Sequence, residues 1–170
     1  MAFKPIQKEI TEDQRRRARE LYSFKNLKGS ITKGKSNIFG ALGEILIFDH
    51  YKSQGVKIDH AQHYDYDFLI GGYKVDIKTK KMSPGLKPRD DWRINIPAYN
   101  TKQKTDFYLW VNVSEDLKEA FFIGYIKKDV FFEEARFCEK GEYDRNGFNF
   151  RDDCYTATME ILSPLKRSLR

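Results

Sequence analysis

The sequence is poor in cysteine and has no long hydrophobic run, and these absences exclude several classes of protein. Cys138 and Cys154 are the only cysteines among 170 residues, and their spacing is not that of a metal site. No apolar run approaches the roughly 20 residues that a membrane span needs. The first ten residues, MAFKPIQKEI, lack the apolar segment of a secretory signal. We therefore expect a cytoplasmic protein with free thiols and no membrane partner.

What is present is enough apolar material for one domain, together with an uneven distribution of charge. Hydrophobic residues make up 40% of the chain and aromatic residues 15%, which argues against disorder. The formal net charge of +6 arises from two basic segments, 1–35 and 74–104, which carry +6 each, whereas 36–73 and 105–170 carry −3 each. Basic segments favour a polyanionic partner, although solubility alone would account for the charge equally well.

Turn residues and apolar spacing predict a mixed α/β domain. Thr11-Glu12-Asp13-Gln14 is a capping box, the next helix is apolar on almost every side and ends at Gly55, and Gly71-Gly72 is typical of a two-residue hairpin turn. We expect helices at 11–24, 37–52, 98–104 and 130–139, strands at 65–70, 73–80, 92–96, 107–113, 120–126 and 155–162, and a polar loop at 141–153.

The predicted hairpin fixes which residues face each other. If Gly71-Gly72 forms the turn, Ile70 pairs with Tyr73 and, counting outward, Asp67 faces Asp76. Directly opposed side chains share one face of a sheet, with Cβ atoms about 5 Å apart.

Alternation along each strand then adds Lys78 beside Asp76, and Asp65 beside Asp67. The opposite face of the hairpin should pack on the buried helix, and it collects Phe68, Ile70, Val75 and Ile77.

Two opposed carboxylates repel each other unless a cation lies between them. Oxygen ligands suit Mg²⁺, and Lys78 beside the ion would orient or deprotonate a water molecule, or neutralise charge on phosphorus. This equipment suits phosphodiester hydrolysis. The alternative is a hairpin with a solvated polar face, on which Lys78 pairs with the acids.

Glu44 supports the catalytic interpretation. It is a carboxylate within a nearly all-apolar helix, where a charge is costly unless it is paired or bound to a metal. The neighbouring Gly43 would let the helix approach the sheet closely. The alternative is a glutamate at the exposed edge of an amphipathic helix.

Glu44, Asp67 and, nine positions after Asp67, Asp76-Ile77-Lys78 together resemble the PD-(D/E)xK nuclease superfamily, and weakly its small phage-type or recombination members. The resemblance implies a restriction-endonuclease-like core of order αβββαβ over 37–113, with a mixed sheet and flanking helices. A basic N-terminal helix and loop (1–36) would precede this core and a C-terminal extension (114–170) would follow it, all within one nuclease domain.

The resemblance also implies roles. Asp67 and Asp76 would ligate Mg²⁺ (or Mn²⁺) together with the carbonyl of Ile77, and Glu44 would support the metal. Lys78 would be the lysine of the motif. The substrate would be DNA, in a bacterial or phage-infected cell. Tyr66 stands where the motif has proline, and Asp65 competes for the role of Asp67.

Basic residues around this motif are candidates for contacts with the DNA backbone. Gln103, on the helix expected after the third strand, is an auxiliary site candidate. Scattered solvation is the alternative for the basic candidates, which are Lys33, Lys35, Lys80, Lys81, Arg89, Arg93, Lys102 and Lys104.

Two other motifs are set aside. Residues 29–36 match the P-loop pattern, but 24–28 are too polar for the buried strand that should precede it, so we expect no nucleotide partner. His60 and His63 are interpreted as surface histidines. We therefore expect a metal-dependent endonuclease, and a homodimer would suit it because cutting two strands commonly requires two sites. The alternative is a non-catalytic nucleic-acid-binding protein on the same fold.

Overall fold

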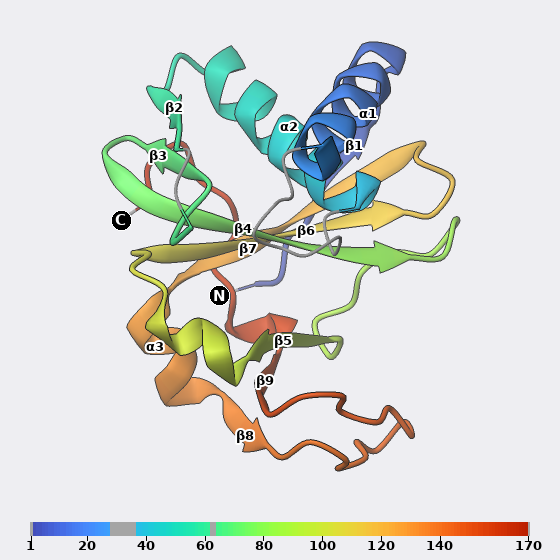
Figure 1. Ribbon diagram of the computed structural model, residues 1–170, viewed down its shortest axis with the longest axis vertical. Coiled ribbons are helices and arrows are strands. Elements are labelled where there is room, and N and C mark those ends of the chain that lie inside the picture. Colours follow the sequence, from blue (N-terminus) through green and yellow to red (C-terminus); the bar gives the residue numbers. More distant parts are fainter. Residues whose placement is uncertain (1, 28–36, 62–63, 170) are drawn as a thin grey trace.

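The computed structural model describes residues 2–27, 37–61 and 64–169, which form three layers (Figure 1). Helices α1 (Glu12–Leu27) and α2 (Ile38–Ser53) cover one face of a six-stranded sheet. A three-stranded sheet and helix α3 (Lys128–Glu134) lie on the other face. No helix in these described ranges is long and apolar enough to cross a membrane.

The six-stranded sheet is mixed, as the sequence predicted. Its strand order is β1-β7-β6-β4-β3-β2, and β4 runs parallel to β6 while its other neighbouring pairs are antiparallel. This order places β4 near the middle of the sheet, between β6 and β3. The strands are β1 (Ile6–Glu9), β2 (Ile58–His60), β3 (Phe68–Ile70), β4 (Tyr73–Met82), β6 (Phe107–Ser114) and β7 (Glu119–Lys127).

The smaller sheet departs from the expected αβββαβ order. Its order is β5 (Arg93–Pro97), β9 (Cys154–Thr158) and β8 (Arg136–Cys138). The third strand of the expected core therefore pairs with β9, far along the chain, instead of joining the main sheet. The helix expected after it is the short 3₁₀ helix η1 (Ala98–Lys102).

Two further expectations near the C-terminus are corrected. The helix expected over 130–139 ends at Glu134, and the next residues form β8, because they pair with β9. The strand expected over 155–162 ends at Thr158 and continues into the 3₁₀ helix η2 (Met159–Ile161). Both differences arise from pairing between segments that are distant in sequence.

The β3–β4 hairpin has the predicted register. Phe68 pairs with Val75 and Ile70 with Tyr73. The φ angles of Gly71 and Gly72 are 56° and 87°, and positive values at both central positions are those of a type I′ turn. Strand β3 is shorter than expected, since it begins at Phe68 and not at residue 65.

Helix α2 lies close to β4 because of Gly43. A Cβ atom on Gly43 would come within 3.0 Å of Thr79 Oγ1, so the helix could not approach the strand as closely with any larger residue. The helix begins where the side chain of Asn37 accepts a hydrogen bond from the Gly40 N–H (2.9 Å). Its buried face and the main sheet share one apolar core, which contains Leu42, Leu46, Ile47, Phe68, Val75 and Leu109.

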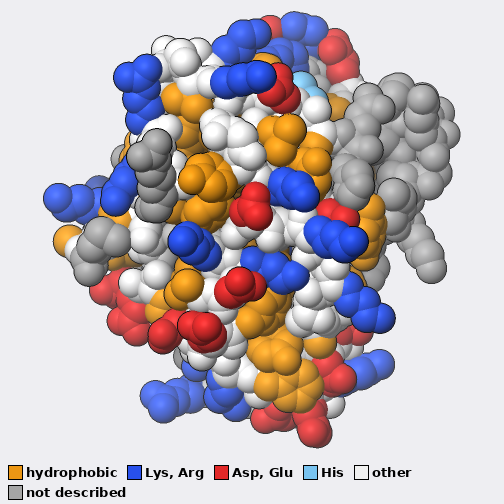
Figure 2. All heavy atoms as spheres, turned by 90° about the vertical axis from the view of Figure 1, so that its left-hand side faces the viewer, with side chains coloured by type: hydrophobic (Ala, Val, Ile, Leu, Met, Phe, Trp, Pro, Cys, Tyr) orange, Lys and Arg blue, Asp and Glu red, His pale blue; other side chains and the backbone are white. Residues whose placement is uncertain are grey.

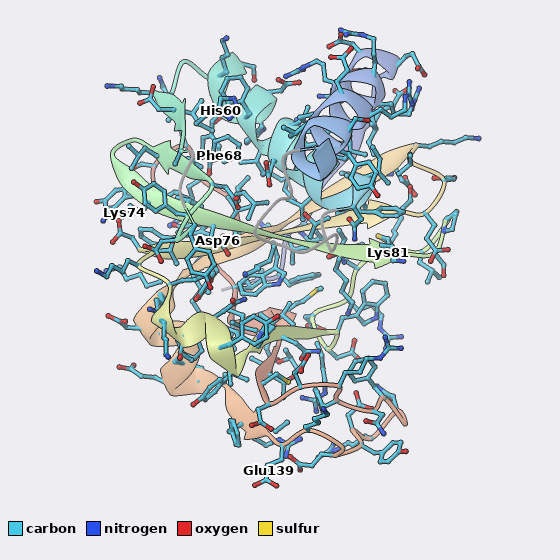
Figure 3. The ribbon with its side chains drawn as sticks, viewed as in Figure 1. His60, Phe68, Lys74, Asp76, Lys81 and Glu139 are labelled. Atoms are coloured by element: carbon cyan, nitrogen blue, oxygen red, sulfur yellow. The ribbon has the colours of Figure 1, made fainter. Side chains whose placement is uncertain are left out.

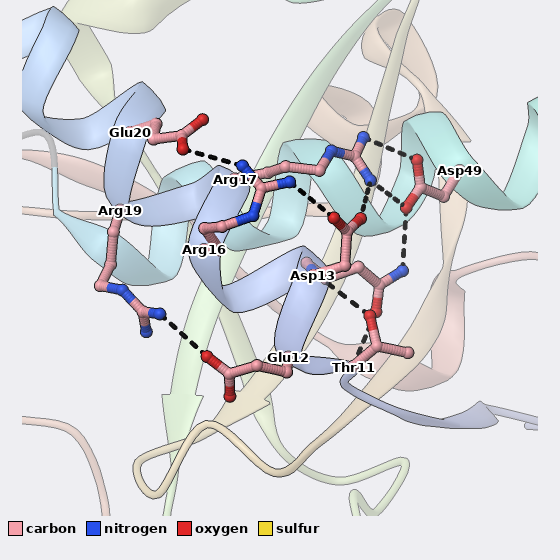
Figure 4. A network of polar contacts seen from close by, with 9 residues as sticks. Thr11, Glu12, Asp13, Arg16, Arg17, Arg19, Glu20 and Asp49 are labelled. Carbon is pink, nitrogen blue, oxygen red and sulfur yellow. Dashed lines mark hydrogen bonds and ion pairs between the residues drawn. The ribbon is translucent and has the colours of Figure 1, made fainter.

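Polar contacts join α1 to α2 (Figure 4). Thr11 and Gln14 form the predicted capping box, with two reciprocal hydrogen bonds of 3.1 Å. The guanidinium of Arg17 donates to both oxygens of Asp49 on α2, at 2.7 and 2.8 Å, and Gln14 donates to the same carboxylate at 3.0 Å. This bidentate pair fixes the position of α1 on the helix that covers the sheet.

Candidate active site

The alternation of β4 separates its apolar side chains from its charged ones. Val75 and Ile77 pack into the core beneath α2. Asp76 and Lys78 point to the other face, on which Asp76 lies beside Tyr108 of β6 in the parallel register. Figure 3 shows Asp76 in the central part of this strand.

Asp76 is a buried acid with an incompletely satisfied carboxylate. Its residue exposure is 7%, and Nζ of Lys78 lies 2.7 Å from its Oδ2. This ion pair lacks hydrogen-bond geometry, so Oδ2 has no hydrogen-bond partner among the described residues. A buried polar atom in this condition is costly, and it is common where a ligand completes the site.

Tyr108 lies against this pair. Its hydroxyl is also buried with no hydrogen-bond partner in the described part of the chain, and Nζ of Lys78 lies 5.5 Å from the centre of its ring. Burial raises the pKa of Tyr108, and the charge of Asp76 raises it further. The phenol therefore stays protonated beside the carboxylate and is available as a hydrogen-bond donor.

Asp67 lies where β3 stops pairing with β4. Its own N–H donates to the carbonyl of Val75 (3.0 Å), and its Oδ2 accepts the N–H of Ile77 (2.7 Å). The carboxylate thus occupies the place of a backbone carbonyl in the ladder. The structure therefore brings Asp67 next to the peptide bond between Asp76 and Ile77, although Asp67 lies just before β3 and outside its ladder with β4.

The other two predicted acids are placed differently. Glu44 lies on α2, which covers the face of β4 opposite to Asp76 and Lys78. Asp65 lies in the bends before β3, so strand alternation does not align it with Asp67. Within the described residues, no three or more His, Cys, Asp or Glu side chains form a group that could hold a metal ion.

The two remaining acids still fit a Mg²⁺ or Mn²⁺ ion. Mg²⁺ is usually held by one or two carboxylates, together with water molecules and phosphate oxygens. Asp76 supplies a buried oxygen that has no hydrogen-bond partner in the described ranges, and Asp67 supplies a second carboxylate at the adjoining peptide. The donor set therefore suits a small divalent cation more than it suits zinc, which prefers nitrogen and sulfur.

The basic candidates divide into three groups. Lys80, Lys81 and Arg93 line a groove of about 370 Å³ next to Lys78. Three others lie elsewhere in the described structure: Arg89 pairs with Asp91 on the surface, and Lys102 and Lys104 lie at the end of η1 and just after it. Lys33 and Lys35 fall outside the described residues, as do the P-loop-like pattern and His63.

The first basic segment carries less available charge than its composition suggests. Each arginine of α1 has a carboxylate partner, and Figure 4 shows most of these pairs. On the face of the molecule seen in Figure 2, basic and acidic side chains are likewise interspersed. The α1 pairs are Arg15–Glu12 (3.0 Å), Arg16–Asp13 (2.7 Å), Arg17–Asp49 (2.7 Å) and Arg19–Glu12 (3.0 Å).

Gln103 is buried, whereas His60 is exposed, as the sequence predicted. The Oε1 of Gln103 has no hydrogen-bond partner among the described residues, and its carbonyl accepts from Lys128 (2.5 Å). His60 stacks on Phe48, with ring centres 4.6 Å apart, so its ring has a packing role.

Sequence reasoning missed Tyr108 and the uncharged lining of the groove. Tyr108 lies in an apolar strand, and only the register of β6 against β4 places it beside Asp76. Asn37, Thr79 and Asn95 line the groove from three separate elements. No local pattern in the sequence marks these residues as neighbours.

Comparisons with known proteins add little to this geometry. No family model matches the chain, and no curated protein matches it. One solved structure that matches is a bacterial homing endonuclease, I-Ssp6803I, at 14% identity and a TM-score of 0.38, over 80% of this chain and 84% of that chain. A TM-score at this level establishes neither a common fold nor a common activity.

Proposed function

We propose that this protein is a metal-dependent endonuclease that hydrolyses phosphodiester bonds in DNA. The observation that carries the proposal is the arrangement on β4: a buried Asp76 carboxylate 2.7 Å from Nζ of Lys78, with Asp67 hydrogen-bonded to the adjoining Ile77 N–H. Two acids and a lysine in one site, beside a groove lined by cations, suit the charge changes of phosphodiester hydrolysis.

The proposed site would hold Mg²⁺ through Asp67 and Asp76, with the carbonyl of Ile77 as a backbone ligand; Glu44, on the helix that covers the opposite face of β4, is not included in this set. The ion would lower the pKa of a bound water and neutralise charge on the phosphate. Lys78 orients the attacking water, or stabilises the charge that develops on the phosphate oxygens. The protonated hydroxyl of Tyr108, which has no hydrogen-bond partner among the described residues, would donate to a bound ligand.

A supercoiled-plasmid assay with Mg²⁺ tests the proposal. Asp76→Asn keeps the shape of the side chain but removes its charge, and Lys78→Met keeps much of the length but removes the ammonium group. Each should lower the rate of nicking by about 10²–10⁴-fold, the usual contribution of a positioned acid–base group. EDTA should abolish nicking by the wild-type protein.

Matched controls are available on the surface. Asp129 and Lys140 are exposed and lie away from β4, so Asp129→Asn and Lys140→Ala make the same charge changes and should nick at the wild-type rate. Equal nicking by the control and site variants would reject the assignment. Metal-independent DNA binding without cleavage would instead identify a non-catalytic nucleic-acid-binding protein.

A further inference from the structure

A basic groove adjoins the proposed active site. It reaches from the start of α2 across the later half of β4 to β5, and Lys78 lines its end nearest to Asp76. Pairing between β3 and β4 ends at Val75, so β4 has β6 alone as a described neighbouring strand along the groove. Figure 3 shows Lys81 farther along the same strand than Asp76.

The charge of this groove is unbalanced. Four cationic side chains line it, and no described lining residue is acidic. Lys78 is paired with Asp76, whereas Lys80, Lys81 and Arg93 have no carboxylate partner within the described residues. Like charges this close repel each other, and an anion between them would remove that repulsion.

Two of these cations contact neighbouring groups. Nζ of Lys80 donates to the carbonyl of Arg93 (2.9 Å) and lies 5.7 Å from the centre of the Trp92 ring. Nζ of Lys81 lies 5.4 Å from the centre of the Phe39 ring. Burial lowers the pKa of Lys80, so a bound anion would also favour its protonated form. The charge of Lys80 is therefore held in place, whereas Lys81 is exposed at the surface.

The uncharged lining suits a phosphate group. Asn95 lines the groove and provides an amide, and Thr79 lines it as well, with its Oγ1 packed against Gly43 of α2. Asn37 begins α2, so the positive end of that helix dipole borders the groove. A volume of about 370 Å³ is at the small end of ligand sites, which commonly measure about 300–1,000 Å³.

We infer that this groove binds a phosphate of a single nucleic-acid strand, the one that neighbours the bond to be cut, with Lys81 and Arg93 as its charged ligands. The inference rests on the proposed function for the position of the cut. The groove admits a nucleotide-sized part of one strand. We therefore expect the substrate to be single-stranded on that side of the cut. Free nucleotides carry the same phosphate groups, and the experiment below distinguishes them from a nucleic-acid strand as the ligand.

Binding of a fluorescent 12-residue oligothymidylate, measured by anisotropy in EDTA at several salt concentrations, tests the groove without any cleavage. For single strands the slope of log K against log [salt] changes by about 0.7 for each phosphate contact. The double variant Lys81→Gln/Arg93→Gln should therefore lose about 1.4 of that slope. Lys87→Gln removes an exposed charge outside the described lining and should keep the full slope.

Chemical shifts locate the binding. In ¹H–¹⁵N spectra of the folded wild-type protein, the oligonucleotide should shift the amide signals of Thr79 and Asn95, and the double variant should retain a native spectrum without these shifts. An unchanged slope in the double variant, or an equal loss in Lys87→Gln, would overturn the inference. ATP that displaces the oligonucleotide with higher affinity would also overturn it, in favour of a nucleotide site.

The two proposals fail separately. If the plasmid assay shows no nicking but the salt slope depends on Lys81 and Arg93, the groove remains and the catalytic role is lost. If nicking occurs and the slope is insensitive to these residues, the groove is rejected and the catalytic site remains. Should both hold, the double variant should raise KM for the plasmid more than it lowers kcat.

Discussion

Replacing Gly43 by alanine should push α2 away from the strand that carries the proposed site. The new Cβ would lie within 3.0 Å of Thr79 Oγ1, 3.3 Å from its Cβ and 3.4 Å from its Cγ2. Thr79 is β-branched and cannot rotate away freely, so this overpacking should cost about 2–3 kcal/mol. Alanine recovers about 1 kcal/mol through its helix propensity, which leaves a net loss of about 1–2 kcal/mol.

Urea unfolding followed by circular dichroism measures this loss, and a second glycine of α2 provides the control. A Cβ on Gly40 would meet only Asn37 Oδ1, at an ordinary 3.7 Å, so Gly40→Ala should stabilise the protein by up to about 1 kcal/mol. Thr79→Ala removes Oγ1 and Cγ2 and leaves the Cβ contact at 3.3 Å, and in that background Gly43→Ala should cost less than about 0.5 kcal/mol. The reasoning is refuted if Gly43→Ala and Gly40→Ala are equally stabilising in the wild-type background.

Two further predictions concern stability. Burial acts to raise the pKa of Asp49, but hydrogen bonds from Arg17 and Gln14, together with the charges of Arg17 and Lys52, outweigh it, so the pKa lies below its ordinary value of 3.8. The stabilisation from this ion pair, about 1 kcal/mol, should be complete above that value and disappear as the pH falls through the lowered pKa. Urea unfolding at several acidic pH values should therefore show that the free energy of unfolding of Asp49→Asn falls less steeply with decreasing pH than that of the wild type. The same pH dependence in both proteins would contradict the assignment. Cys138 and Cys154 are free but directly opposed in the β8–β9 register. Oxidation by diamide, which takes two electrons and two protons from the thiols, should therefore join them in a disulfide and stabilise the fold by about 3 kcal/mol. If mass spectrometry finds no cross-link in the oxidised folded protein, that register is contradicted.

The parts of the fold that depend on neighbouring residues could be predicted from the sequence. The register of β3 against β4 follows from Gly71-Gly72, because a two-residue turn leaves one way to pair the flanking strands. The capping box of α1 and the buried character of α2 follow in the same way from residues within one or two helical turns. The alternation of β4, which separates Val75 from Asp76, is equally local.

The parts that depend on distant segments could not be predicted. Strand β5 pairs with β9 across more than fifty residues, and nothing within Arg93–Pro97 indicates that partner. Arg17 of α1 pairs with Asp49, 32 residues away on α2, and nothing within α1 indicates that partner. The groove combines residues from α2, β4, β5 and β6, so its lining is a property of the packed structure.

The hydrogen bond from the Ile77 N–H to Asp67 gives one side chain two duties. It accepts the N–H that a carbonyl of a paired strand would accept, and it brings a negative charge to the point where those strands separate. Substitution by alanine would loosen this junction as well as remove the charge. Loss of nicking in Asp67→Ala would therefore reveal little about the role of the charge. Asparagine retains an acceptor for the Ile77 N–H but carries no charge. Asp67→Asn is therefore the variant that distinguishes the structural role of this side chain from the role of its charge.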